Sequence, residues 1–139
     1  MNPSSSLWWR FGHEAHFEFG FTDARSDLGN RAIAEPDAAV RPPLEQRHHL
    51  EQVLQEGVGT SALVFMNQVH GKHVVTAEQG NTAQADALIV DQPGIAAVVR
   101  VADCVPIVIG AIGQPLVSVV HAGRAGLVAN IVAETCAAL

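Results

Sequence analysis

Five apolar runs between residues 62 and 122 constrain the fold more than any other feature of the sequence. They occupy residues 62–69, 73–77, 85–90, 95–110 and 115–122. Consecutive apolar positions of this kind are typical of strands that are covered on both faces of a sheet. The run 95–110 is long enough for two strands or for one kinked strand. The sequence therefore predicts a domain built around a β-sheet.

The N-terminal part predicts one strand between irregular segments. Residues 16–22 alternate between apolar and other side chains, which indicates a half-buried strand. Its apolar face carries Phe17, Phe19 and Phe21. We expect residues 1–12 to be a loose terminus in which Trp8 and Trp9 cap the edge of the core. Residues 23–43 are polar and rich in proline, which predicts a long loop.

Two helices complete the predicted elements. Residues 43–57 begin with proline, carry an apolar face and end at a glycine, as expected of a helix. Residues 123–139 turn through glycines into a helix that runs to the last residue. The elements together predict an α/β (α+β) fold, and we expect residues 1–139 to form a single domain.

Composition and charge limit the partners of the chain. Its 139 residues are 48% hydrophobic and 16% charged, which argues against a disordered chain. The net charge of −6 argues against nucleic acid or an anionic membrane as the main partner, since both require a basic surface. Two cysteines and the lack of a long apolar run at the N-terminus predict a cytoplasmic protein with free thiols.

Three soft or borderline metal ligands lie where strands are predicted to end or to be interrupted. They are His70, Cys104 and His121, separated by 34 and 17 residues. Three protein ligands leave a fourth position of zinc open, which is the catalytic arrangement. The alternatives are a cysteine that is only a small buried hydrophobe and histidines that make structural hydrogen bonds. The residues themselves leave both interpretations open.

Two neighbouring residues can support such a site. Asp103 precedes Cys104 and can hold an imidazole by its second nitrogen; the alternative is that it faces solvent. The turn "HAGRAG" at residues 121–126 can hold an anion on backbone N–H groups, with Arg124 adding positive charge. Glycines that simply make the turn explain the same pattern.

Four motifs in fixed order resemble the YfiH-like family, also called the laccase-domain or multicopper polyphenol oxidoreductase family. They read "NQVHG" (67–71), "ADAL" (85–88), "ADCVPI" (102–107) and "VHAGRAG" (120–126). The resemblance covers roughly residues 16–139, and four ordered motifs are more specific than any one of them. It implies an α/β fold with a central mixed β-sheet flanked by helices. It also offers a reason for the acid, the thiol and the proline that interrupt the apolar run 95–110. The resemblance implies that Cys104 is a ligand and that Pro106 marks a bend or a sheet edge.

The resemblance also implies an activity and a set of site residues. Members are described as purine nucleoside phosphorylases that act on adenosine, inosine and methylthioadenosine, and that also deaminate adenosine. It implies that His70, Cys104 and His121 are both zinc ligands and catalytic residues. The partners implied are a purine nucleoside and phosphate, with no nucleic acid and no membrane. Substrate binding then falls on four residues: Arg25, Asn67, Gln68 and Arg124.

The sequence departs from the family pattern at three places. Arg124 stands where the family turn His-Ala-Gly-Trp-Arg-Gly has tryptophan, so the arginine is displaced by one residue. The loop around Arg25 lacks the family's Gly-Gly-Val-Ser run. The family continues for roughly another hundred residues past Leu139. We therefore expect a partial domain without the C-terminal half, weak turnover, and exposed apolar surface that favours a homo-oligomer or the missing half as partner.

Other functions fit parts of the same pattern. A degenerate relative would keep the fold and the metal and act as a binding or assembly module. A Cys-His hydrolase would use Cys104 as its nucleophile, and some bacterial relatives are linked to peptidoglycan editing. The copper-oxidase label fits poorly, because the sequence holds one Cys-His-His set and no His-x-His pairs.

Overall fold

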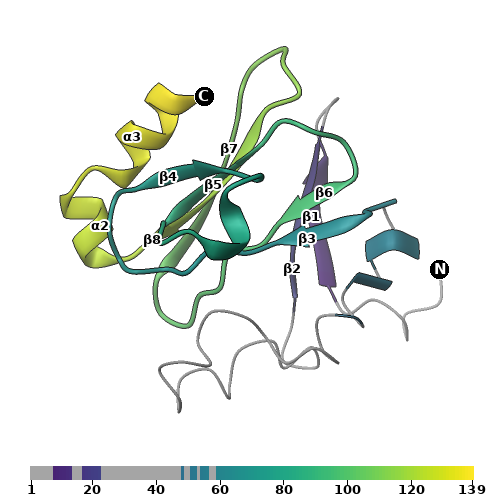
Figure 1. The fold of residues 1–139 in the computed structure, drawn as a ribbon, viewed down its shortest axis with the longest axis horizontal. Helices are drawn as coiled ribbons and strands as arrows, with labels where there is room; N and C mark the ends of the chain where they lie inside the picture. The colour runs from purple at the N-terminus through teal and green to yellow at the C-terminus, as the bar shows by residue number, and fades with distance from the viewer. Residues whose placement is uncertain (1–7, 14–16, 23–47, 49–50, 53, 57–58) are drawn as a thin grey trace.

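The structure is a computed structural model that describes residues 8–13, 17–22, 48, 51–52, 54–56 and 59–139. The predicted loop 23–43 and the side chains of Trp8 and Trp9 lie outside the described residues. Figure 1 shows the two C-terminal helices on one side of the molecule and the N-terminal strand pair on the other, with the main sheet between them.

A mixed four-stranded sheet forms the centre of the fold. Its order is β4 (Val74–Thr76), β5 (Ala87–Val90), β8 (Val117–Ala122) and β7 (Val105–Gly110). The β4–β5 pair is parallel, while β8 runs antiparallel to both β5 and β7. This confirms the α/β class and the predicted mixed sheet.

The run 95–110 forms two strands that belong to different sheets. β6 (Ile95–Ala97) pairs in parallel with β3 (Ala62–Val64), whereas β7 joins the main sheet. A short 3-10 helix, η3 (Gly80–Thr82), connects β4 to β5. Of the two alternatives that the sequence left open for this run, two strands is therefore correct and one kinked strand is wrong.

The first described strand was not predicted from the sequence. β1 (Trp8–His13) pairs antiparallel with β2 (Glu18–Thr22), so the expected loose terminus at residues 1–12 is wrong for its last five positions. The reason is that a half-buried strand needs a partner for its backbone groups. A register shift between Arg10 and Gly12 accompanies the pairing.

The predicted apolar face of β2 is confirmed. Three phenylalanine rings and two side chains of β7 line a groove of about 310 Å³. They are Phe17, Phe19, Phe21, Pro106 and Val108.

The C-terminal helix is interrupted. α2 (Arg124–Val128) and α3 (Ile131–Ala138) are separated at Asn130, whose φ of 67° lies in the left-handed region. The single helix expected over this segment is therefore wrong, because asparagine adopts the left-handed conformation more readily than most residues. Within the predicted helix 43–57, the described residues 48, 51–52 and 54–56 are helical.

Both faces of β5 are covered, as its apolar run predicts. Ala87 packs in a cluster with Ile131 of α3, and Leu88, on the opposite face, packs with Met66. All four residues of β5 are buried. β7 differs, because it lies at the edge of the sheet and its residues stay half-buried or exposed. None of the described helices has the length and apolar character needed to cross a bilayer.

Candidate metal centre

The three predicted ligands meet at one end of the main sheet. Antiparallel pairing places the end of β8 beside the start of β7, with Pro106 opposite His121. Cys104 directly precedes β7. The expectation that this cysteine interrupts a strand is therefore wrong. Pro106 does lie in an edge strand, as predicted. His70 comes from the segment between β3 and β4 and has a left-handed backbone with a φ of 60°.

The side chains of these residues form a compact donor set. Their ligand atoms all lie within 4.8 Å of one another, and Cys104 Sγ lies 3.8 Å from His70 Nε2. The two imidazole rings are 4.6 Å apart and nearly perpendicular. His121 is buried, Cys104 is half-buried and His70 is exposed, so the set opens to solvent on the side of His70.

The separation of Cys104 Sγ and His70 Nε2 is close to that of two ligands on one tetrahedral zinc ion. Bonds of about 2.3 Å to sulfur and about 2.0–2.1 Å to nitrogen place the two ligand atoms about 3.5 Å apart. The observed separation of 3.8 Å between Cys104 Sγ and His70 Nε2 is close to that value. Within the described part of the chain, this is the one group of three metal-ligating side chains.

A buried carboxylate supports the donor set. Asp86 directly precedes β5 and is fully buried. Its Oδ1 lies 2.8 Å from His121 Nδ1, which leaves Nε2 of that ring for a metal. Asp103, the expected partner of an imidazole, instead lies beside Cys104, with its Oδ1 3.8 Å from Sγ. The signal for Asp86 was an acid next to an apolar strand in the "ADAL" motif.

Burial and the carboxylates of Asp103 and Asp86 affect the pKa of the Cys104 thiol. Partial burial raises the pKa of the Cys104 thiol, and the Asp103 carboxylate raises it further, with a contribution from Asp86. The metal-free thiol therefore prefers its protonated form, and a cation at the donor set would reverse this preference.

Two glycines bring α2 close to the site. A Cβ atom on Gly123 would lie 2.8 Å from His70 Cδ2 and 3.2 Å from Cys104 Sγ. A Cβ atom on Gly126 would lie 2.7 Å from the carbonyl oxygen of Gly71. The glycines of the "HAGRAG" turn therefore have a steric role that the sequence pattern did not reveal.

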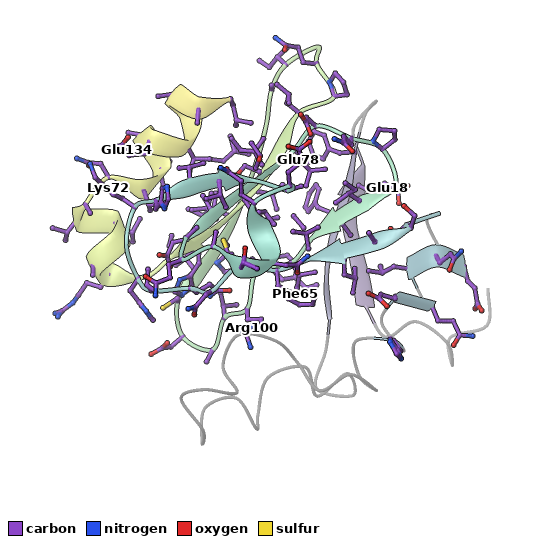
Figure 2. The ribbon with its side chains drawn as sticks, viewed as in Figure 1. Glu18, Phe65, Lys72, Glu78, Arg100 and Glu134 are labelled. Atoms are coloured by element: carbon purple, nitrogen blue, oxygen red, sulfur yellow. The ribbon has the colours of Figure 1, made fainter. Side chains whose placement is uncertain are left out.

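An ion pair links the His70 segment to the last helix. Lys72 Nζ lies 2.7 Å from Glu134 Oε1 of α3, and the two side chains point toward each other (Figure 2). Both side chains are largely exposed, so we expect a small contribution to stability.

The four predicted substrate-binding residues have different surroundings. Gln68 uses its side-chain amide on the backbone of Arg100, with Nε2 donating to the carbonyl at 2.7 Å and Oε1 accepting from the N–H at 2.8 Å. Asn67 is half-buried and forms a backbone bridge with Gln84. Arg124 is exposed at the first residue of α2. Arg25 lies outside the described residues.

Comparison with known proteins shows a family match over most of the chain. The model of the multi-copper polyphenol oxidoreductase laccase family matches residues 30–139. The chain belongs to this family. The matched range contains all three residues of the donor set and Asp86.

Several proteins of similar sequence are named purine nucleoside phosphorylases. One from Corynebacterium glutamicum is 33% identical over 119 residues, which cover 82% of this chain and 46% of the relative. Another from Streptomyces griseus is 35% identical over 114 residues, covering 78% of this chain and 44% of the relative. The chain thus spans less than half the length of these curated relatives.

Solved structures show the same fold. A Neisseria meningitidis protein assigned to the family model DUF152 superposes with a TM-score of 0.71 at 26% identity, covering 96% of this chain and 57% of that one. YlmD from Geobacillus stearothermophilus gives a TM-score of 0.55 at 28% identity, covering 73% of this chain and 39% of that one.

Proposed function

We propose that the chain binds zinc through His70, Cys104 and His121 and carries the metal-binding part of a purine nucleoside phosphorylase site. The observation that carries the proposal is the convergence of these three side chains, with ligand atoms within 4.8 Å, at the end of the sheet. The names of the relatives supply the substrate class.

The reaction would exchange the base of a nucleoside for phosphate. A phosphate oxygen forms a bond to C1′ of the ribose while the bond from C1′ to the purine nitrogen breaks. The electron pair of that bond leaves with the base, which takes up the proton that the attacking hydrogen phosphate loses, and a sugar 1-phosphate is formed. When bound, zinc would supply positive charge able to polarise an oxygen of the substrate or of water.

The chain's own residues would hold and orient the reactants. His121 presents Nε2 to the site because its Nδ1 is held by Asp86. Exposed His70 marks the open side from which substrate enters. Arg124, at the start of α2 directly after Gly123, supplies a guanidinium for phosphate, and Arg25 is the second candidate for this role.

Hydrolytic deamination of adenosine is a second candidate at the same site. Three protein ligands with an open side leave room for water as well as for phosphate. A Cys-His hydrolase is disfavoured, because the raised pKa of the Cys104 thiol is the opposite of what an activated nucleophile requires.

The test combines metal content with turnover. The purified chain is analysed for zinc, and release of free base from adenosine, inosine and methylthioadenosine is followed by chromatography with and without phosphate. We expect about one zinc per chain and slow phosphate-dependent turnover, below the ordinary range of roughly 1–1,000 per second, because Arg124 is displaced from its family position. Appearance of inosine from adenosine would identify deamination.

The control uses the second cysteine. Cys104→Ala should lose both metal and turnover, whereas Cys136→Ala, at an exposed position on α3, should keep both. Unchanged zinc content in Cys104→Ala would refute the metal site. Zinc binding without any turnover would support the metal-binding or assembly module instead.

A further inference from the structure

The carboxylate of Asp86 is saturated with hydrogen bonds. Oδ1 accepts the backbone N–H of His70 at 2.9 Å and the His121 Nδ1–H at 2.8 Å. Oδ2 accepts the backbone N–H of Gly71 at 2.7 Å and that of Val69 at 3.3 Å. A carboxylate has about four lone-pair positions. Each oxygen of this buried side chain accepts from two donors, so all four positions are used.

The backbone half of this arrangement fixes the conformation of His70. Three successive N–H groups, from Val69 to Gly71, point at one carboxylate, which is the pattern of an anion-binding nest. His70 lies at its centre with a φ of 60°, a conformation that is rare for residues other than glycine. The Asp86 carboxylate compensates this conformation by satisfying all three donors.

The side-chain half fixes the imidazole of His121. Donation from Nδ1 to Oδ1 selects the tautomer whose Nε2 carries a lone pair. The backbone N–H of His121 also donates to the carbonyl oxygen of Asp86 at 2.7 Å. The ring of His121 is therefore held by the same residue that holds the backbone of His70.

We propose that Asp86 is the positioning residue of the metal centre: it sets both histidines in their ligand geometry before a metal binds. The inference rests on the metal site proposed above, but it assigns the role to a residue that does not touch the metal. Partners of this kind orient histidine ligands in other metal sites, and their loss typically weakens metal affinity about 10–100-fold.

The decisive variant is Asp86→Asn, which keeps the size of the side chain. Each oxygen of Asp86 accepts two N–H groups, and asparagine replaces one of these oxygens with an NH₂ group. Whichever oxygen is replaced, the new NH₂ donor then faces N–H donors. At the Oδ1 position it opposes the His121 Nδ1–H, and at the Oδ2 position it releases Gly71 and Val69. Asp91→Asn is the matched control, because this exposed acid follows the same strand and lies outside the site.

The readouts are zinc affinity and the tautomer of the metal-free histidine. Competition with a chromophoric chelator should show a 10–100-fold loss of affinity in Asp86→Asn and a change below about twofold in Asp91→Asn. In alkaline buffer, nitrogen NMR of the metal-free wild type should show His121 with its proton on Nδ1. This second measurement does not require the variant to fold.

The outcomes separate this inference from the proposed function. Wild-type affinity in folded Asp86→Asn, or a proton on Nε2 of His121 in the wild type, would overturn the role of Asp86. A variant that only unfolds more easily and binds zinc normally would likewise overturn it. A wild type without zinc affinity would refute the proposed metal site while the tautomer still tests Asp86.

Discussion

Replacing Gly123 with alanine should weaken metal binding while leaving the fold intact. The new methyl carbon would lie 2.8 Å from His70 Cδ2, whereas carbon atoms in contact are about 3.5–4.0 Å apart. His70 would therefore have to retreat by about 0.7 Å or more, and the Cys104 sulfur by a few tenths of an ångström. Metal–ligand distances tolerate only about 0.2 Å.

The same substitution should be nearly neutral for stability. Gly123 has φ −75° and ψ 163°, a conformation that alanine adopts without strain. Alanine is a poorer residue than glycine at the start of a helix, which costs roughly 0.5–1 kcal/mol. Alanine also restricts the unfolded chain, which stabilises by about 0.4–1 kcal/mol. The two effects roughly cancel, so the free energy of unfolding of the metal-free chain should change by less than about 1 kcal/mol.

Two assays check this separation. Zinc competition should show an affinity loss of about 10–100-fold, comparable to the loss of a supporting residue. Urea unfolding in chelator should give a midpoint close to that of the wild type. Ala125→Ser, which adds one atom at an exposed position of α2, is the control and should match the wild type in both. Zinc affinity within twofold of wild type in Gly123→Ala would refute the argument.

Three further predictions concern packing and protonation. Gly126→Ala should lower the free energy of unfolding by about 1–3 kcal/mol in urea titrations. The reason is that the alanine methyl group would clash with the carbonyl oxygen of Gly71, which belongs to the backbone. Gln68→Ala should lower it by about 1–3 kcal/mol in thermal unfolding, because both backbone groups of Arg100 lose a partner. The raised pKa of Cys104 means that less thiolate is present at neutral pH, so alkylation of the metal-free chain should be slower than that of a model thiol and should accelerate above the ordinary thiol range. Mass spectrometry follows the alkylation. A rate at pH 7 that is faster than for the model thiol would contradict the raised pKa of Cys104.

The sequence is most informative about the main sheet and least informative about β1. The apolar runs at 73–77, 85–90 and 115–122 contain β4, β5 and β8. The central strand β5 shows the reason most clearly, because all four of its residues are buried and burial on both faces selects consecutive apolar residues. β1 depends on pairing with β2, which no local pattern specifies. The break at Asn130 was missed for a related reason, because its apolar neighbours continue the helical pattern on both sides.

The candidate site shows the same division. The structure brings together the three residues that the motifs mark as ligands, His70, Cys104 and His121. The role proposed for Asp86 follows from its contacts with the backbone of residues 69–71 and with His121, which is 35 positions away. The closeness of Gly123 to the donor set follows from how α2 approaches the His70 segment. Contacts of this kind depend on the folded arrangement and leave little trace in local sequence.

The position of Pro106 in edge strand β7 affects how this chain meets other chains. An open strand edge offers N–H and C=O groups to any strand that arrives, and this is a route to uncontrolled stacking of sheets. The β7–β8 ladder continues through Pro106, so the missing N–H is on the outer side of β7. An incoming strand therefore meets no N–H donor at Pro106. This proline, two residues after Cys104, thus also protects the sheet against edge-to-edge aggregation.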